Sequence, residues 1–140
     1  METTNYTFRV ELPVDFESAV KLTTEHLQEQ GFGILTEIDV TRTLKEKLDV
    51  DYRQYKILGA CNPQLAHRVL EVEEEIGTLL PCNVAVFEES NDTVKVAAMN
   101  PNSAMSVVHN DAVDPIADEV AQKLKTALSN LRDAVGEVKR

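Results

Sequence analysis

The segment that most constrains this fold is a pair of strand-like runs joined by a short polar turn. Leu79-Leu80-Pro81 bends the chain into residues 82–89, and Asn91-Asp92 turns it back through residues 93–99. Two such runs around a short turn are typical of a β-hairpin. Because the strands of a hairpin run in opposite directions, the sheet of this protein must contain antiparallel pairing.

Three further strands are predicted upstream, from side chains that alternate along the chain. Every second residue is apolar over residues 6–12, and the same period of two recurs over 32–38 and 52–61. Strand side chains point alternately to opposite faces of a sheet, so this spacing predicts strands with one apolar face. Gly59, inside the third of these runs, marks a bulge or the close approach of another segment.

Helices are predicted where apolar residues recur at helical spacing between start and stop signals. Asn62-Pro63 and Asp114-Pro115 each combine a capping side chain with a proline that fits the first helical turn. Glycines that accept a left-handed conformation end three of the helices. The predicted helices lie between Asp15 and Gly31, over residues 40–48, between Asn62 and Gly77, and between Asp114 and Gly136, with a polar connection from Asn100-Pro101 to Asp114.

These elements predict a single α+β domain over residues 1–140. About five strands and three or more helices without a regular βαβ repeat indicate a mixed or mainly antiparallel sheet covered by helices. No internal repeat, low-complexity tract or domain linker interrupts the sequence. A chain of this length is long enough to form one hydrophobic core.

Composition and charge restrict the partners of the chain. Lys and Arg number 14 against 24 Asp and Glu, so the formal net charge is −10 at pH 7. This excess repels phosphate backbones and anionic membrane surfaces at long range, so we expect neither nucleic acid nor membrane as a partner. The N-terminus has no signal-peptide pattern and no segment has the length of a membrane span, so we expect a cytoplasmic protein with free thiols.

Cys61 is the strongest candidate for a chemically active residue. It lies in Gly59-Ala60-Cys61-Asn62-Pro63, where a strand ends and a helix begins, and Asn62 is expected to cap that helix. The positive end of a helix dipole lowers the pKa of a nearby thiol, whereas burial raises it. Alternation groups Cys61 with Tyr55 and Ile57, which favours burial. The competing interpretation is a small buried hydrophobic residue at a tight turn.

The second thiol, Cys82, follows the bend at Leu80-Pro81. A disulfide with Cys61 would require Cα atoms within about 7 Å. The sequence leaves this open, because a parallel crossover would put the two thiols at opposite ends of the sheet. The three histidines are dispersed, and His67 has Glu71 one turn later, which predicts a solvated ion pair. No catalytic motif and no metal site are predicted.

Two segments with cysteines carry a family resemblance. YKILGACNP with the helix after it, and LLPCNVAVFE with the acidic hairpin that leads to MNP, resemble the uncharacterised domain-of-unknown-function family 302, over most of the span from Phe8 to Leu128. The resemblance implies a β-α-β(4)-α fold like that of the TATA-binding-protein group, without its DNA binding, in cytoplasmic proteins that tend to form homodimers. The motif positions of the family are, in this sequence, Cys61, Asn62, Pro63, Pro81, Cys82 and Asn83.

The leading functional hypothesis is a non-enzymatic cytoplasmic binding or regulatory module that acts as a homodimer. Its ligand, a small molecule or a partner protein, would occupy a groove between sheet and helices. The alternative is a thiol-dependent redox protein, or a metal- or cofactor-binding protein, that uses Cys61 with or without Cys82. A purely structural subunit is the third hypothesis. The motif positions are the candidate ligand-binding or thiol residues, and no catalytic residue is predicted.

Overall fold

A computed structural model describes residues 1–90 and 92–138, and six strands in this part of the chain form one open sheet. The strand order is β1-β2-β6-β5-β4-β3, and each pair of neighbours is antiparallel. The antiparallel hairpin and the α+β class are therefore confirmed. The strands are β1 (Glu2–Thr3), β2 (Thr7–Leu12), β3 (Gly33–Asp39), β4 (Tyr55–Cys61), β5 (Cys82–Ser90) and β6 (Thr93–Met99).

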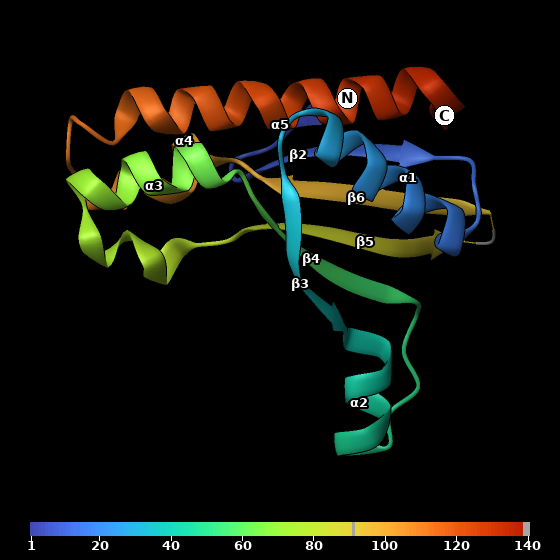
Figure 1. Cartoon of the computed structure of the whole chain (residues 1–140). Coiled ribbons are helices and arrows are strands. Elements are labelled where there is room, and N and C mark those ends of the chain that lie inside the picture. Colours follow the sequence, from blue (N-terminus) through green and yellow to red (C-terminus); the bar gives the residue numbers. More distant parts are fainter. Residues whose placement is uncertain (91, 139–140) are drawn as a thin grey trace.

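The helices gather mainly on one side of the sheet (Figure 1). The longest, α5, runs the length of the sheet and contacts β2 and α1, and α1 also contacts β5 and β6. Among the described helices, none combines the length and apolar character needed to cross a bilayer. The helices are α1 (Phe16–Glu29), α2 (Val40–Leu48), α3 (Pro63–Val72), α4 (Pro101–Ala104) and α5 (Asp114–Val135), with two 3-10 segments, η1 (Glu74–Leu79) and η2 (Met105–Val108).

The principal elements follow the expected β-α-β(4)-α order, with several additions. β2, α1, the four strands β3 to β6, and α5 give that order, and α2, α3 and α4 are inserted between them. The short edge strand β1 was not predicted, because two residues show no period. The predicted polar connection instead contains α4 and η2. Residue 91, in the predicted hairpin turn, lies outside the described residues.

Local capping explains where most helices begin and end. Asp15 accepts a hydrogen bond from the Ser18 N–H at 2.7 Å, and this contact lowers the pKa of Asp15. Gly31 ends α1 with a φ of +85°, as the sequence predicts. Two boundaries differ from expectation. The α-helix α3 gives way to η1 before Gly77, and Asp114 lies in the first turn of α5 without capping it.

The core lies between one face of the sheet and the helix layer. Alternate residues of the central strands are buried on this side, and α1 and α5 contribute the opposing side chains. On the strands the buried hydrophobic residues are Phe8, Val10, Leu12, Leu58, Ala60, Cys82, Val84, Val86, Val94, Val96 and Ala98.

The register of β3 corrects one sequence interpretation. A bulge between Ile34 and Thr36 inserts an extra residue against β4. Because the bulge shifts the alternation, Ile34 pairs with Ala60 on the helix side, whereas Ile38 pairs with Ile57 on the opposite side. The predicted single apolar face for residues 32–38 is therefore wrong.

Residues 40–53, which we call the arm, stand away from the helix layer at the β3 edge of the sheet (Figure 1). The arm comprises α2 and the segment that leads into β4. The predicted amphipathic helix is confirmed, yet none of its residues is buried. One side chain fixes its base: the Thr41 hydroxyl donates to the Arg53 carbonyl oxygen at 2.6 Å and accepts from the Tyr55 N–H at 2.8 Å.

Candidate functional site

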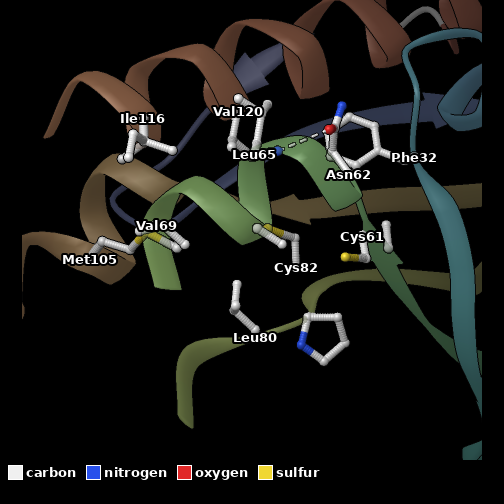
Figure 2. Close-up of a pocket in the computed structure, with 14 residues that line it drawn as sticks. Phe32, Cys61, Asn62, Leu65, Val69, Leu80, Cys82, Met105, Ile116 and Val120 are labelled. Carbon is white, nitrogen blue, oxygen red and sulfur yellow. Dashed lines mark hydrogen bonds between the residues drawn. The ribbon is translucent and has the colours of Figure 1, made fainter. Parts of the chain in front are cut away.

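The two cysteines meet at one end of the sheet. Because β4 and β5 are antiparallel neighbours, the end of one strand lies beside the start of the other, and Cys82 pairs directly with Ala60. Cys61 is the next residue along β4, and both thiols line the same cavity beneath α3 (Figure 2). They are free thiols, Cys61 half-buried and Cys82 buried.

This cavity is small and apolar. Its volume is about 20 Å³, which is room for one water-sized body, whereas pockets for organic ligands usually exceed about 300 Å³. This cavity lies between sheet and helices, where a ligand groove was expected. Besides the two thiols, the walls include Phe32, Leu65, Val69, Leu80, Met105 and Val120 (Figure 2).

Asn62 and Pro63 have structural roles at this end of the sheet. The Asn62 side-chain oxygen accepts a hydrogen bond from the Leu65 N–H at 3.3 Å, which confirms Asn62 as the N-cap of α3 (Figure 2). Pro63 occupies the first helical position, where no N–H is required. The Asn62 amide nitrogen would lie only 3.0 Å from a Cβ at Gly31, so it also fits against the turn that follows α1.

Pro81 packs across β4 against Gly59. The Leu80-Pro81 peptide bond is cis, and the proline ring lies beside the glycine on the strand. A Cβ at Gly59 would be 2.1 Å from the Thr36 hydroxyl oxygen and 2.7 Å from Cγ of Pro81. The close approach predicted at Gly59 is therefore present, between β3 and the residue that precedes β5.

Burial decides the protonation of both thiols. It raises the pKa of Cys61, and it raises the pKa of Cys82 to about 11, with a further contribution from the charge of Cys61. Of the two opposing effects expected at Cys61, burial is therefore the larger. Both sulfurs carry their protons at neutral pH and are poor nucleophiles in that state.

Asn83, the remaining motif position, lies away from this cavity. It belongs to the sheet face opposite the helices, which no described element covers and which we call the uncovered face. A hollow of about 390 Å³ lies on this face, within the size range of ligand sites. The motif positions are thus divided between two sides of the sheet: Cys61, Asn62, Pro81 and Cys82 line the cavity, and Asn83 lines the hollow.

A row of apolar side chains crosses the uncovered face. Strand register places these residues opposite one another on successive strands, and on β5 and β6 their neighbours along the strand are buried in the core. The side chains in the middle of the row, Ala85 and Ala97, are small, and they line the hollow. From β3 to β6, the row consists of Ile38, Ile57, Ala85 and Ala97.

An aromatic pair lies beside this row. The rings of Tyr55 and Phe87 stack with centroids 4.9 Å apart and an interplanar angle of 9°. Tyr52, from the arm, lies 6.2 Å from Tyr55 and tilts by 44°. Burial raises the pKa of Tyr55, and the neighbouring tyrosines Tyr52 and Tyr6 add to this. The aromatic pair thus forms an uncharged wall of the hollow.

The cations at the hollow are held by carboxylates. Arg9 pairs with Glu2 at 2.7 Å. Lys95 lies 3.2 Å from Glu89 and 3.7 Å from Glu11, and its ammonium is 6.0 Å from the Phe87 ring centroid. Positive charge at the rim is therefore largely balanced, which disfavours this face as a site for phosphate-rich ligands.

The predicted contact between His67 and Glu71 is present: His67 Nε2 lies 3.0 Å from the Glu71 carboxylate on the exposed side of α3. Among residues 1–90 and 92–138, no group of three His, Cys, Asp or Glu side chains is arranged to hold a metal ion.

Sequence reasoning did not identify the hollow. It grouped Tyr55 and Ile57 and favoured their burial, whereas they lie on the uncovered face and Leu58 and Ala60 form the core side of β4. One signal was available. In the hairpin both faces carry apolar residues, with Val84 and Val86 on one side and Ala85 and Phe87 on the other. A strand that is apolar on both faces is typical of one that is covered on both.

Comparisons with known proteins agree with this architecture. A crystal structure of an uncharacterized conserved protein DUF302 from Bacillus stearothermophilus is similar, with a TM-score of 0.83 and 30% sequence identity over 90% of this chain and 98% of that chain. No curated protein matches the chain. The family model described as domain of unknown function DUF302 matches residues 8–131. That match covers most of the sheet, both thiols and most of α5, and by it the chain belongs to the DUF302 family, for which no function is assigned.

Proposed function

We propose that this protein is a non-enzymatic interaction module that acts as a homodimer through its uncovered sheet face. The observation that carries the proposal is the apolar row from Ile38 to Ala97 beside the stacked Tyr55 and Phe87. An antiparallel sheet with one solvated face normally carries polar residues there. An apolar strip across four strands instead favours a surface that a partner covers.

Binding is favoured over catalysis by the chemistry of the hollow and of the cavity that contain the motif positions. In the hollow, the cations Arg9 and Lys95 are engaged by carboxylates. In the smaller cavity, burial keeps Cys61 and Cys82 protonated. General acid–base or nucleophilic catalysis needs a group whose pKa is close to the working pH. The charge of −10 argues against nucleic acid and anionic membrane as the partner.

The proposal is tested by the mass of the particle in solution. At ~50 µM and physiological salt, sedimentation velocity is expected to give about twice the 15.6 kDa of one chain. Ala97→Glu places a charge in the middle of the apolar row and is expected to weaken the dimer at least tenfold. Gln122→Glu adds the same charge at an exposed position of α5 and is the matched control. A wild-type particle of one chain mass contradicts the proposal.

A thiol-dependent function is the second candidate, favoured by the presence of both thiols in one cavity. Its test is the rate of iodoacetamide alkylation against pH for the wild type, Cys61→Ser and Cys82→Ser. Because burial raises the pKa of each thiol, we expect alkylation at neutral pH to be slower than for an unfolded thiol. Alkylation of Cys61 faster than this reference would favour the thiol function over the interaction module.

A further inference from the structure

The arm presents exposed apolar side chains at its tip. Leu48 is 65% exposed, and Val50 and Tyr52 are exposed as well. They lie on one short stretch, the last turn of α2 and the segment that follows. Because Thr41 holds both ends of the arm at its base, the arm is a defined projection with an apolar tip.

The exposed area of the molecule reflects this projection. The total is 7898 Å², against roughly 7,200 Å² expected for a folded monomer of this mass. The difference is close to the ~800 Å² that each partner buries in an interface of standard size. The chain thus exposes somewhat more surface than an average folded monomer of its mass.

Charge distinguishes the arm from the body. Residues 40–53 contain four basic and three acidic side chains, a net charge of +1. The whole chain carries −10, so the body carries −11. An arm of opposite sign to the body is complementary to a second copy of the same chain.

On these three observations, and resting on the proposed homodimer, we propose that the arm of each copy lies across the uncovered face of the other. Leu48, Val50 and Tyr52 would cover the hollow beside Phe87 and Met99 of the second copy. A two-fold axis makes the contact reciprocal, so that each copy both gives an arm and receives one. Both apolar surfaces of the chain would then be buried by a single interaction.

The first test compares two lysine substitutions at similarly exposed apolar residues. Leu48 lies on the arm, whereas Val107, 69% exposed on η2, lies outside both surfaces. Leu48→Lys is expected to raise the dimer dissociation constant at least tenfold in sedimentation velocity, and Val107→Lys to change it less than threefold. Circular dichroism of both variants checks that each retains the fold.

The second test maps the contact directly. A photoreactive benzoylphenylalanine at position 48 is expected to give a covalent dimer whose linked peptide lies in β2, β4, β5 or β6, the strands that line the hollow. Mixing 15N-labelled and unlabelled chains shows that the link joins two copies.

Three outcomes are decisive. Covalent dimers linked to these strands, together with a selective effect of Leu48→Lys, support the arm contact. A wild-type dimer that links elsewhere, or that Leu48→Lys and Val107→Lys weaken equally, overturns the arm contact and leaves the homodimer. A wild-type chain that stays monomeric overturns both proposals and leaves the arm and the face to another partner.

Discussion

Gly59 shows how one missing side chain permits the packing of three segments. Thr36 from β3 and Pro81, the residue before β5, both occupy the space that a Cβ would need. Gly59→Ala forces a contact of 2.1 Å with the Thr36 hydroxyl oxygen, and neither β-branched threonine nor the proline ring can easily turn away. We therefore expect the free energy of unfolding to fall by roughly 1–3 kcal/mol.

Urea unfolding of Gly59→Ala and Gly77→Ala measures this effect. Gly77 is the matched control, because a Cβ there meets no atom within 4 Å and the backbone has no positive φ. Its substitution should change stability by no more than about 0.5 kcal/mol. Equal losses in the two variants would show that the contact at Gly59 is not the cause.

The thiol of Cys82 makes the fold sensitive to alkaline pH. Its pKa is about 11 in the folded protein, whereas an unfolded chain releases this proton near about 8.5. Between these values the folded state holds more protons than the unfolded state, so the free energy of unfolding falls as pH rises. The slope reaches about 1.4 kcal/mol per pH unit, and the full contribution is present only below the unfolded pKa.

Stability curves for the wild type and Cys82→Ala, from about pH 7.5 to about pH 10.5, isolate this contribution. The alanine variant starts lower, because it loses a buried sulfur, and the two curves are expected to converge by roughly 2 kcal/mol at high pH. Parallel curves would show that the Cys82 thiol is not linked to folding. Titration of lysine and tyrosine side chains lowers the free energy of unfolding of both proteins alike, so this loss cancels in the difference between the two curves.

At the scale of elements, the hydroxyl of Thr41 ties the arm to the sheet. Thr41→Val keeps the shape of the side chain and removes the hydrogen bonds to Arg53 and Tyr55. Because no residue of α2 is buried, little else holds the arm in place. Amide hydrogen exchange over residues 40–53 should become at least tenfold faster, while exchange in α5 stays unchanged.

Thr43→Val is the control for this experiment. It makes the same substitution on the same helix, where no hydrogen bond of the hydroxyl defines the base of the arm. Equally faster exchange in both variants would show that lower local helix propensity, rather than the lost anchor, loosens the arm.

Sequence reasoning succeeded for elements whose signals are local. The Asp15 and Asn62 caps and the β5–β6 hairpin depend on residues within a few positions, and all are present. It was less informative about which face of a strand is covered. Alternation along β4 separates Tyr55 and Ile57 from Leu58 and Ala60, but only the placement of α1 and α5 decides which set is buried.

The sequence singled out the two thiols that line the cavity, but it did not indicate how they are arranged. The two thiols become neighbours because β4 and β5 are antiparallel, a relation between segments that no local pattern contains. The bulge between Ile34 and Thr36, which turns Ile38 to the uncovered face, likewise has no signal in the alternation. The apolar spacing over residues 40–48 predicted the helix α2, and it did not indicate that none of its residues is buried.

At the scale of the whole molecule, self-association must overcome charge. Each chain carries −10, and two domains of this size place their centres about 35 Å apart on contact. With the Debye length of about 30 Å at 10 mM salt, their mutual repulsion is on the order of 4 kcal/mol, and with about 8 Å at 150 mM it is well below 1 kcal/mol. Attraction from the arm, at +1, involves surface charges worth about 1 kcal/mol at most.

Repulsion is therefore the larger of the two effects, and salt should strengthen the homodimer. We expect the dissociation constant measured by sedimentation to fall at least tenfold as NaCl rises from ~10 to ~150 mM, and to change little above this range. An interface governed by ion pairs between arm and body would weaken with salt instead. Lys47→Gln, which lowers the arm charge by one, serves as the comparison. It should change the dissociation constant at ~10 mM NaCl and leave it unchanged at ~150 mM. A dissociation constant that rises with salt in the wild type would show that arm charge, and not the apolar contact, holds the two copies together.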